Sequence, residues 1–530
     1  MNRISCFACT HWPFVVGLLA GFYFLGLPVT GRDFAYFPGD FGDARFNMYL
    51  VEHATLFFRG WVKDYWDAPF MYPEPHVIAY ADNLLGASPF YGLFRMLGLD
   101  RHTSFQCWFH LLSALNFTAC YLFLFYWTRN AKAAVLGALV FAYSIALQSQ
   151  MSHIQTFSRF PIPLAFWMSM LFMRRYQPVY FALALGFVVY EFYCGMYLGL
   201  LLIIPMTILY LWMIIKYRRV LLEKAHSKNW MKQMVLALLI NVLMLYPLLN
   251  IYARQMDLAS LPSHETILST VPTITSHFFA HSGSIWKVLT EFGVDREEAW
   301  WHHQIFAGGI ATMCILVMII VVLVRKWRCT WLTDDANDPL LLMVFGSGIL
   351  MMVLFVKIRS ASLYMYLSRL DGFASIRQVA RIINVELLFF AIATSFVLRP
   401  LFRRYSKWSG LIFIGCLGLL VLDNSYRSEQ SYRQSKIKSQ EAIAYVEQKL
   451  KDLPPGALFS YEPTDTGTVK VFYHIDAMLA AQTYGLKTVN GYSGYFPYGY
   501  GDYWKNMNEE SRKYWFYVKE FAPNKIYILK

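Results

Sequence analysis

Long apolar runs recur between residue 14 and residue 422 of this 530-residue chain, and they constrain its fold more than any other feature. A backbone in lipid has no water to bind, so a spanning segment must satisfy its own hydrogen bonds, usually as a helix of about 20 apolar residues. We therefore predict an α-helical polytopic membrane protein with about eleven transmembrane helices. The predicted spans are residues 12–29, 105–127, 131–147, 157–173, 179–191, 195–215, 233–251, 305–324, 339–356, 382–398 and 409–422.

The loops between these runs hold many of the basic residues behind the formal net charge of +13. If the N-terminus is cytoplasmic, eleven spans make every inside loop basic, as the positive-inside rule requires. Arg174 with Arg175, and Arg403 with Arg404, are examples. A net charge of this size also suits nucleic acid, but the sequence has no Gly-rich phosphate loop and no zinc spacing. We predict a multi-pass membrane protein with no nucleic-acid partner.

The fifth and sixth predicted spans share one apolar stretch, which is interrupted at residues 191–195. Glu191 would lie in lipid if this stretch ran straight through the membrane, and a buried charge of that kind is costly. The interruption therefore predicts a tight turn, although the fifth span is short for a full crossing.

The opposite side of the membrane carries much longer segments. They comprise a first outer loop at residues 30–104, a second at about 252–304, a third at 357–381, and a tail beyond residue 422. In the tail, residues 439–451 form an amphipathic pattern that Pro454-Pro455-Gly456 ends, and strand-like runs lie at 457–461 and 525–529. We predict a transmembrane domain over residues 1–422 and a small extracytoplasmic α/β domain over 423–530.

Asp43 lies just beyond the first span, at the start of a stretch with helical character over residues 44–59. A carboxylate at a membrane edge is costly unless it has a partner or a function. It could act as a general base or orient a substrate, with Phe41 and Phe46 desolvating it and raising its pKa. The alternative is that Asp43 only caps the helix that follows.

Asp40 precedes Asp43 by three residues, across a glycine. The two carboxylates are a possible site for a divalent cation, which prefers oxygen ligands. The alternative for Asp40 is turn formation, because Pro-Gly-Asp is common turn chemistry. Asn47, four residues after Asp43, would share its helix face and could contact a sugar hydroxyl there.

Two further segments carry polar side chains toward the same side. His153 and Gln155 follow the third span, and His153 could donate to a phosphate or a sugar, although a lone loop histidine is more often a surface residue. The second outer loop contains several histidines whose spacing matches no zinc motif. These are His264, His277, His281, His302 and His303.

Arg377 and Arg381 precede the tenth span and lie four positions apart. In a helix this spacing presents both guanidinium groups on one side, which suits a phosphate or pyrophosphate. The alternative is that they bind ordinary anionic lipid headgroups. Outer loops usually carry few basic residues, and this favours a specific phosphate role.

A segment rich in tyrosine and glycine runs from residue 490 to residue 500 and contains Tyr492 and Tyr495. Aromatic faces between glycines are suited to binding sugars, and they also anchor proteins at membrane interfaces.

In the order of these elements, the chain resembles the C-type (GT-C) fold of polyprenyl-phosphate-dependent glycosyltransferases, within a poorly characterised group of bacterial membrane proteins. Four segments carry the resemblance and together extend over nearly the whole chain. They are Gly42-Asp43-Ala44-Arg45-Phe46-Asn47, His153-Ile154-Gln155 with Pro161-Ile162-Pro163-Leu164, Ser375 to Arg381, and Val489-Asn490-Gly491-Tyr492-Ser493-Gly494-Tyr495-Phe496-Pro497.

The resemblance implies an inverting hexosyl- or pentosyltransferase of the bacterial inner membrane, acting on its extracytoplasmic face. A polyprenyl-phosphate sugar would be the donor, and an envelope glycan, lipid or protein the acceptor. Asp43 would deprotonate the acceptor, Arg377 and Arg381 would hold the phosphate, and the segment with Tyr492 and Tyr495 would close the site. The family often shows Asp-Glu or Asp-x-Asp in its first loop, whereas this chain has Asp40-x-x-Asp43, so dependence on a divalent cation stays open.

Two alternatives belong to other classes of protein. A lipid-linked saccharide transporter or flippase would need polar groups along a path through the bilayer, and few charged residues interrupt the predicted spans. A non-catalytic protein of envelope assembly would keep the fold without the activity. The concentration of polar features outside the spans favours surface chemistry.

Overall fold

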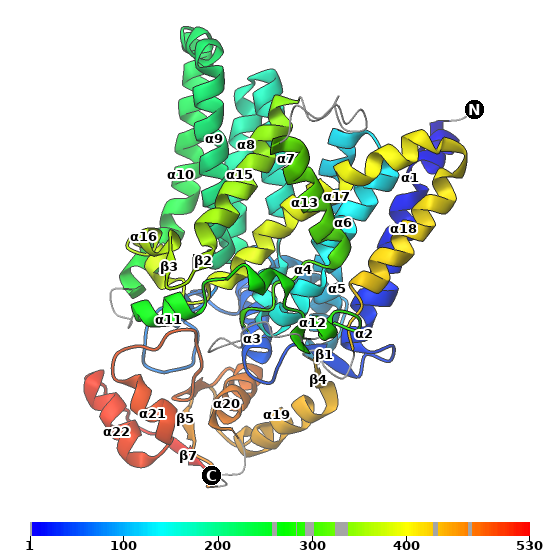
Figure 1. Cartoon of the computed structure of the whole chain (residues 1–530). Coiled ribbons are helices and arrows are strands. Elements are labelled where there is room, and N and C mark those ends of the chain that lie inside the picture. Colours follow the sequence, from blue (N-terminus) through cyan, green and yellow to red (C-terminus); the bar gives the residue numbers. More distant parts are fainter. Residues whose placement is uncertain are drawn as a thin grey trace.

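The structure, a computed structural model, describes residues 3–256, 262–281, 283–291, 302–323, 338–427, 433–464 and 469–530. Figure 1 shows a bundle of long helices that carries a smaller α/β unit at one end. The bundle contains α1 (Arg3–Ala20), η1 (Gly21–Gly26), α2 (Leu27–Thr30), α5 (Arg101–Thr128), α6 (Ala131–Tyr143), η3 (Ile145–Phe157), α7 (Pro161–Arg175), α8 (Pro178–Cys194), α9 (Met196–Ala225), α10 (Lys228–Met256), α13 (Gly309–Leu323), α15 (Pro339–Phe355), α17 (Ile383–Arg404) and α18 (Ser409–Asp423).

Six helical segments are long and apolar enough to cross a membrane, by length and composition. They are His11–Thr30, Arg101–Thr128, Met196–Ala225, Lys228–Gln255, Val379–Arg404 and Ser406–Asp423. The pair α6 and η3, bent by 51°, adds a seventh if it counts as one span, and α8, α13 and α15 are shorter apolar helices. Each of the eleven predicted spans falls on a helix, so the chain is a multi-pass membrane protein, while the count of eleven stays a prediction.

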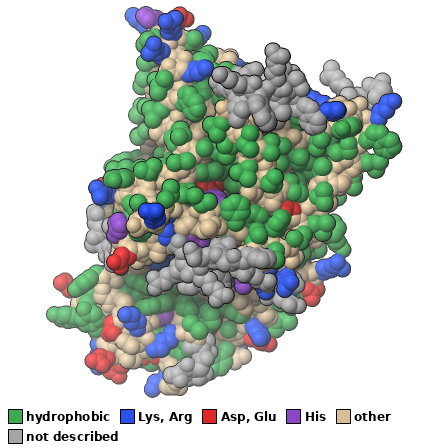
Figure 2. All heavy atoms as spheres, in the orientation of Figure 1, with side chains coloured by type: hydrophobic (Ala, Val, Ile, Leu, Met, Phe, Trp, Pro, Cys, Tyr) green, Lys and Arg blue, Asp and Glu red, His purple; other side chains and the backbone are tan. Residues whose placement is uncertain are grey.

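Figure 2 shows how the two parts of the molecule differ at the surface. Hydrophobic side chains cover the helical bundle, and charged side chains gather at the far tip of α9 and α10 and over the α/β unit. Along α10, Leu239, Leu243 and Met244 are among many large apolar side chains that are more than half exposed. This pattern is expected for helices that face lipid tails.

The turn predicted at residues 191–195 is present. The helix α8 ends at Cys194, Gly195 has extended backbone with φ −175° and ψ 126°, and α9 begins at Met196. Glu191 is fully buried inside the protein and interacts electrostatically with Arg159. Neither of its carboxyl oxygens has a hydrogen-bond partner among the described residues.

The first long loop forms a layer between the bundle and the α/β unit. It contains β1 (Tyr36–Pro38), α3 (Asp43–Phe58), η2 (Val77–Tyr80) and α4 (Ser88–Met96). In the corresponding layer from later in the chain lie α11 (His264–Ser269), η4 (Thr275–Phe278), α12 (Lys287–Glu291), β2 (Lys357–Ile358), β3 (Ala361–Ser362), α16 (Tyr364–Leu367), η6 (Phe373–Ser375) and η7 (Val379–Ile382). The short helix η8 (Ser406–Trp408) instead joins α17 to α18.

The C-terminal unit is a small parallel sheet with helices. Its strands are β5 (Leu458–Tyr461), β6 (Lys487–Thr488) and β7 (Tyr527–Leu529), in the order β6-β5-β7, and its helices are α19 (Lys436–Leu450), α20 (Lys470–Tyr484), α21 (Tyr500–Asn506) and α22 (Glu509–Val518). In register, Phe459 lies opposite Thr488 on one side and Tyr527 on the other. A domain boundary at residue 422 remains our proposal.

Several contacts fix this unit against the first loop. The strand β4 (Arg433–Ser435) pairs antiparallel with β1, so that Phe37 lies opposite Gln434. Arg45 of α3 forms a buried ion pair with Asp476 of α20. At Gly491, an added Cβ would lie 2.2 Å from Cγ of Met71, so only glycine allows this close approach. The α/β unit is therefore held directly on the helix that begins at Asp43.

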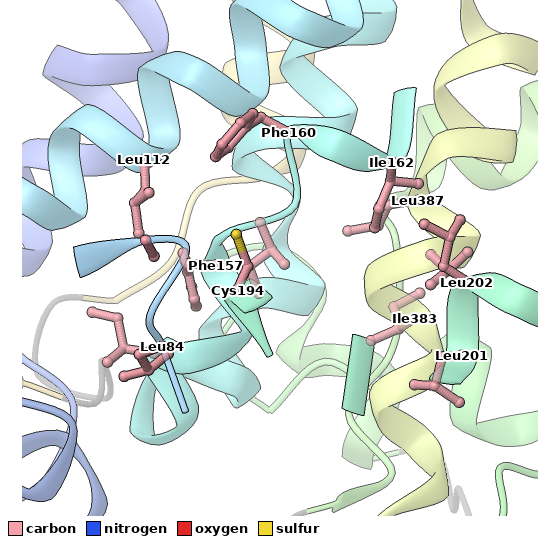
Figure 3. Close-up of a cluster of buried hydrophobic side chains, with 14 of the residues drawn as sticks. Leu84, Leu112, Phe157, Phe160, Ile162, Cys194, Leu201, Leu202, Ile383 and Leu387 are labelled. Carbon is pink, nitrogen blue, oxygen red and sulfur yellow. The ribbon is translucent and has the colours of Figure 1, made fainter. Parts of the chain in front are cut away.

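Buried apolar side chains fill the bundle beneath this layer. Figure 3 shows side chains of different segments in this core, among them Leu84 of the first loop, Phe157 at the end of η3 and Cys194 at the end of α8. These side chains are at most 2% exposed. The packing fixes the ends of three separate segments at one level of the bundle.

Candidate functional site

Asp43 is the first residue of α3, so its side chain lies at the positive end of a helix. The residue before it, Gly42, is the N-cap and makes no side-chain cap bond. Oδ1 of Asp40 instead accepts hydrogen bonds from the backbone N–H groups of Gly42 at 3.0 Å and Ala44 at 3.2 Å. Capping therefore belongs to Asp40, as turn chemistry predicts, and the alternative of a capping Asp43 is wrong.

The carboxylate of Asp43 makes two long-range side-chain contacts. The hydroxyl of Tyr492 donates a short hydrogen bond to Oδ1, and Nδ1 of His153 lies 2.9 Å from Oδ2. His153 reaches this position because its backbone leaves helical geometry, with φ −108° and ψ 58°, in the middle of η3. Three segments far apart in the sequence therefore meet at one carboxylate, whose side chain is 26% exposed.

The two carboxyl groups differ in their electrostatics. Burial alone would raise the pKa of Asp43, but the contacts with His153 and Tyr492 and the charge of Arg381 bring it down to about 2. The predicted upward shift from Phe41 and Phe46 is therefore wrong. Burial, with the nearby charge of Asp43, raises the pKa of Asp40 to about 6. Asp43 is therefore ionised at neutral pH, and Asp40 titrates slightly below neutral pH.

Asn47 and Gln155 meet beside this carboxylate. Nδ2 of Asn47, which is almost fully buried, donates to Oε1 of Gln155 at 2.7 Å. Asn47 lies one turn after Asp43 on α3, and Gln155 lies two residues after His153 on η3. The structure thus brings together the four predicted polar residues of these two segments, and the amide pair joins the segments to each other.

Arg377 and Arg381 do not share a helix, contrary to the prediction. Only residues 379–382 form a short 3₁₀ helix, η7, and Arg377 precedes it. The two side chains nevertheless lie over neighbouring aromatic rings, Arg377 at 5.6 Å from the ring centre of Tyr495 and Arg381 at 4.6 Å from that of Tyr197. The charge of Arg381 acts on Asp43, so the arginines lie on the same site as the carboxylate.

The two tyrosines of the predicted segment occupy different positions. Tyr492 contacts the carboxylate directly, as described above. The hydroxyl of Tyr495 donates a short hydrogen bond to the backbone oxygen of Ser375, while its own N–H donates to the oxygen of Tyr80 at 3.0 Å. The segment from β6 to α21 therefore spans the site from Asp43 to the arginines.

Two residues of the site, Tyr197 and Asp82, were not predicted from the sequence, and His302 was noted without a role. Tyr197 carries Arg381 on its ring, Oδ1 of Asp82 accepts the N–H of Tyr197 at 3.4 Å, and the charge of Arg381 acts on Asp82. His302, noted earlier without a role, has its pKa lowered to about 3 by burial and by the positive charge of His153 and Arg381. Tyr197 follows the break at Gly195, and a tyrosine just after such a break was the available signal.

The described residues contain no group of three or more His, Cys, Asp or Glu side chains arranged to hold a metal ion. Asp40 uses Oδ1 on backbone N–H groups, and both oxygens of Asp43 already have partners. The described residues therefore hold no preformed ligand set for the possible divalent cation, and dependence on a cation stays open.

The whole fold matches a solved membrane enzyme. The archaeal oligosaccharyltransferase AglB from Archaeoglobus fulgidus, solved with an inhibitory peptide and a dolichol-phosphate, aligns over 97% of this chain and 69% of its own, with TM-score 0.50 and 10% identity. The fold is GT-C-like. Because the identity is so low, the likeness concerns the fold and not the activity.

Two further structures of the Archaeoglobus fulgidus oligosaccharyltransferase are similar at 12% identity. The apo form aligns over 91% of this chain and 64% of its own with TM-score 0.46, and the complex with Zn and sulfate over 96% and 66% with TM-score 0.45. This GT-C-like chain therefore spans about two thirds of their length. No protein-family model and no curated protein matches its sequence.

Proposed function

We propose that this chain is a membrane glycosyltransferase that moves a sugar from a polyprenyl-phosphate donor to an envelope glycan, lipid or protein acceptor. One observation carries the proposal. An ionised carboxylate, Asp43, lies within the field of Arg381 at the end of the bundle that bears the α/β unit. A carboxylate for the acceptor and guanidinium groups for the leaving phosphate are the two requirements of such a transfer.

The guanidinium groups have spare donors for the phosphate. No side-chain hydrogen bond from Arg377 or Arg381 to a described residue exists, and Nε of Arg381 is buried without a partner. Arginine presents five N–H donors in a planar fork that matches a phosphate. AglB, whose fold is similar, was solved with a dolichol-phosphate, and this supports a polyprenyl phosphate as the ligand here.

In the proposed reaction, an acceptor hydroxyl attacks the anomeric carbon of the sugar as the bond from that carbon to the phosphate oxygen breaks. The electron pair leaves with the phosphate, which Arg377 and Arg381 stabilise, and the anomeric configuration inverts. Asp43 orients the hydroxyl, but a pKa of about 2 makes it a weak base. Of the two carboxyl groups, Asp40, with a pKa of about 6, is better matched to take up the proton of the acceptor hydroxyl.

The same assignment places the site on the extracytoplasmic face, with the N-terminus in the cytoplasm and the protein in the bacterial inner membrane. Basic loops between the spans support this orientation, because they would all lie on the cytoplasmic side. The lipid donor would then enter from the outer leaflet, sideways into the end of the bundle.

The decisive test is mass spectrometry of envelope glycans from a deletion strain carrying plasmid copies of the gene. We expect a sugar to be missing from the deletion strain and from cells with Asp43→Asn, and to return with wild type. Asp33→Asn is the matched control, because Asp33 is an exposed carboxylate of the same loop whose only hydrogen bond within the described residues is from the N–H of Ala35. Membrane abundance is measured for each variant.

Two outcomes would contradict the proposal. Full restoration of the glycan by Asp43→Asn at normal abundance would remove Asp43 from the chemistry. Accumulation of complete lipid-linked glycan on the cytoplasmic side alone would indicate a transporter instead.

A further inference from the structure

Tyr197 makes more contacts with the arginine segment than any residue predicted for the site. It is the second residue of α9, directly after the break at Gly195, and its side chain is half-buried. Its hydroxyl accepts hydrogen bonds from the backbone N–H groups of Arg377 at 2.8 Å and Gln378 at 3.3 Å. Its ring lies 4.6 Å from the guanidinium carbon of Arg381.

These contacts matter because the arginine segment has little structure of its own. Residues 376–378 lie between two short 3₁₀ helices and form neither helix nor strand. Thr270 holds the other side, since its hydroxyl donates to the oxygen of Arg377 at 2.8 Å and accepts the N–H of Val379 at 3.1 Å. Thr270 therefore fixes the backbone, whereas Tyr197 fixes both the backbone and a guanidinium group.

The ring contact is also what orients Arg381. This side chain is 7% exposed, and no described residue accepts a hydrogen bond from it. A cation on an aromatic face is attracted by the ring's electron density, most strongly when water is excluded. The N–H donors that do not face the ring then remain available to an anion.

Tyr197 is itself fixed from the first loop. Its backbone N–H donates to Oδ1 of Asp82 at 3.4 Å, and Asp82 lies two residues after the end of η2. Asp82 and Arg381 also act on each other through their charges. The first loop, the start of α9 and the arginine segment therefore meet at one tyrosine.

We propose that Tyr197 is a positioning residue of the donor-phosphate site, which holds Arg377 and Arg381 in the geometry that binds the lipid phosphate. This inference rests on the proposed function, because it presupposes that the arginines bind that phosphate. Tyr197 does not touch the reacting atoms. It acts through the ring under Arg381 and through the hydroxyl at Arg377.

The test measures binding of two probes to the purified full chain in detergent, a short-chain polyprenyl phosphate and the matching uncharged polyprenol. Wild type should bind the phosphate more tightly than the alcohol. Tyr197→Ala should raise the Kd for the phosphate roughly tenfold and leave that for the alcohol unchanged. Tyr197→Phe keeps the ring and loses the hydroxyl, so a rise of about threefold is expected.

Tyr193→Phe is the matched control. Tyr193 lies near the end of α8, just before the break at Gly195, and its hydroxyl donates to the backbone oxygen of Met244 at 2.8 Å and not to the arginine segment. Its loss should leave the binding of both probes unchanged. The control therefore separates a general weakening of the α8–α9 turn from the loss of the arginine support.

The results separate the role of Tyr197 from the phosphate-binding role of the arginines. If wild type binds both probes equally, the phosphate role of the arginines fails, and the inference fails with it. If Arg381→Ala weakens phosphate binding but neither Tyr197→Ala nor Tyr197→Phe does, only the role of Tyr197 is wrong. Equal weakening of both probes by the two Tyr197 variants would mean a merely structural role, and would also overturn it.

Discussion

The carboxylate side of the site and its arginine side are held in different ways. Around Asp43, polar side chains contact one another directly: Tyr492 and His153 contact its two oxygens, and Asn47 binds Gln155. Around Arg377 and Arg381, the guanidinium groups lie on aromatic rings and the hydrogen bonds go to the backbone. On the carboxylate side both oxygens of Asp43 have partners without a ligand, whereas on the arginine side guanidinium N–H donors remain available.

This difference indicates which side of the site stabilises a bound anion more. A carboxylate with a pKa of about 2 already has its charge stabilised by Tyr492 and His153, so a further hydrogen bond from an acceptor hydroxyl adds less stabilisation there. A guanidinium on an aromatic face loses little when a phosphate binds its outer edge. Donor binding should therefore depend on the arginines, and the rate of transfer on the carboxylate.

The largest expected effect tests the arginine side. Arg381→Ala should weaken binding of a polyprenyl phosphate by roughly 2–4 kcal/mol, because it removes a charged group from a largely water-excluded position. Arg377→Ala should cost less, since Arg377 is exposed to solvent and its charge is screened. Calorimetry with the purified protein measures both. Equal affinity in wild type and Arg381→Ala would leave only the headgroup interpretation for this pair.

Much of this architecture could be predicted from sequence, because it follows from local patterns. The helix predicted at residues 439–451 is α19 at 436–450, and the turn at 191–195 lies where a charge interrupts an apolar run. Both features depend on nearby residues only. Asp43 and Tyr492 could be named for the same reason, since each lies in a distinctive short segment.

The contacts between segments could not be predicted. A spacing of four suggested that Arg377 and Arg381 share a helix, but Tyr197 and Thr270 hold this segment open from other elements. The pKa of Asp43 was expected to rise through its phenylalanine neighbours in the sequence. It falls because a histidine more than a hundred residues away reaches it, and no local pattern records that contact.

A smaller expected effect tests the carboxylate side, through the hydrogen bond from Tyr492 to Asp43. Tyr492→Phe removes one hydrogen bond to a charged group and keeps the ring, which packs at 5.3 Å from Phe46. A bond of this kind contributes roughly 1.5–3 kcal/mol, so we expect transfer to slow at least tenfold while the Kd for the lipid phosphate stays unchanged. Steady-state kinetics with a varied donor concentration separates the effect on the rate of transfer from the effect on donor affinity. A change in donor affinity alone would contradict the division between the two sides.

The smallest effect concerns Asp40, whose raised pKa predicts a stability that depends on pH. The folded protein favours the protonated acid, so this contribution is fully present below the unfolded pKa of 3.8 and is lost as the pH rises through about 6. Asp40→Asn stays neutral, and its amide oxygen can still accept from Gly42 and Ala44. Thermal unfolding in detergent should therefore show the variant more stable than wild type at pH 7.5, by roughly 1–2 kcal/mol because solvent partly screens this half-buried group, and equal to it near pH 4. Asp33→Asn, an exposed carboxylate in the same loop, provides the baseline. A stability difference between wild type and Asp40→Asn that is the same at both pH values would mean that folding does not raise the pKa of Asp40, and would remove the reason to prefer Asp40 over Asp43 as the base.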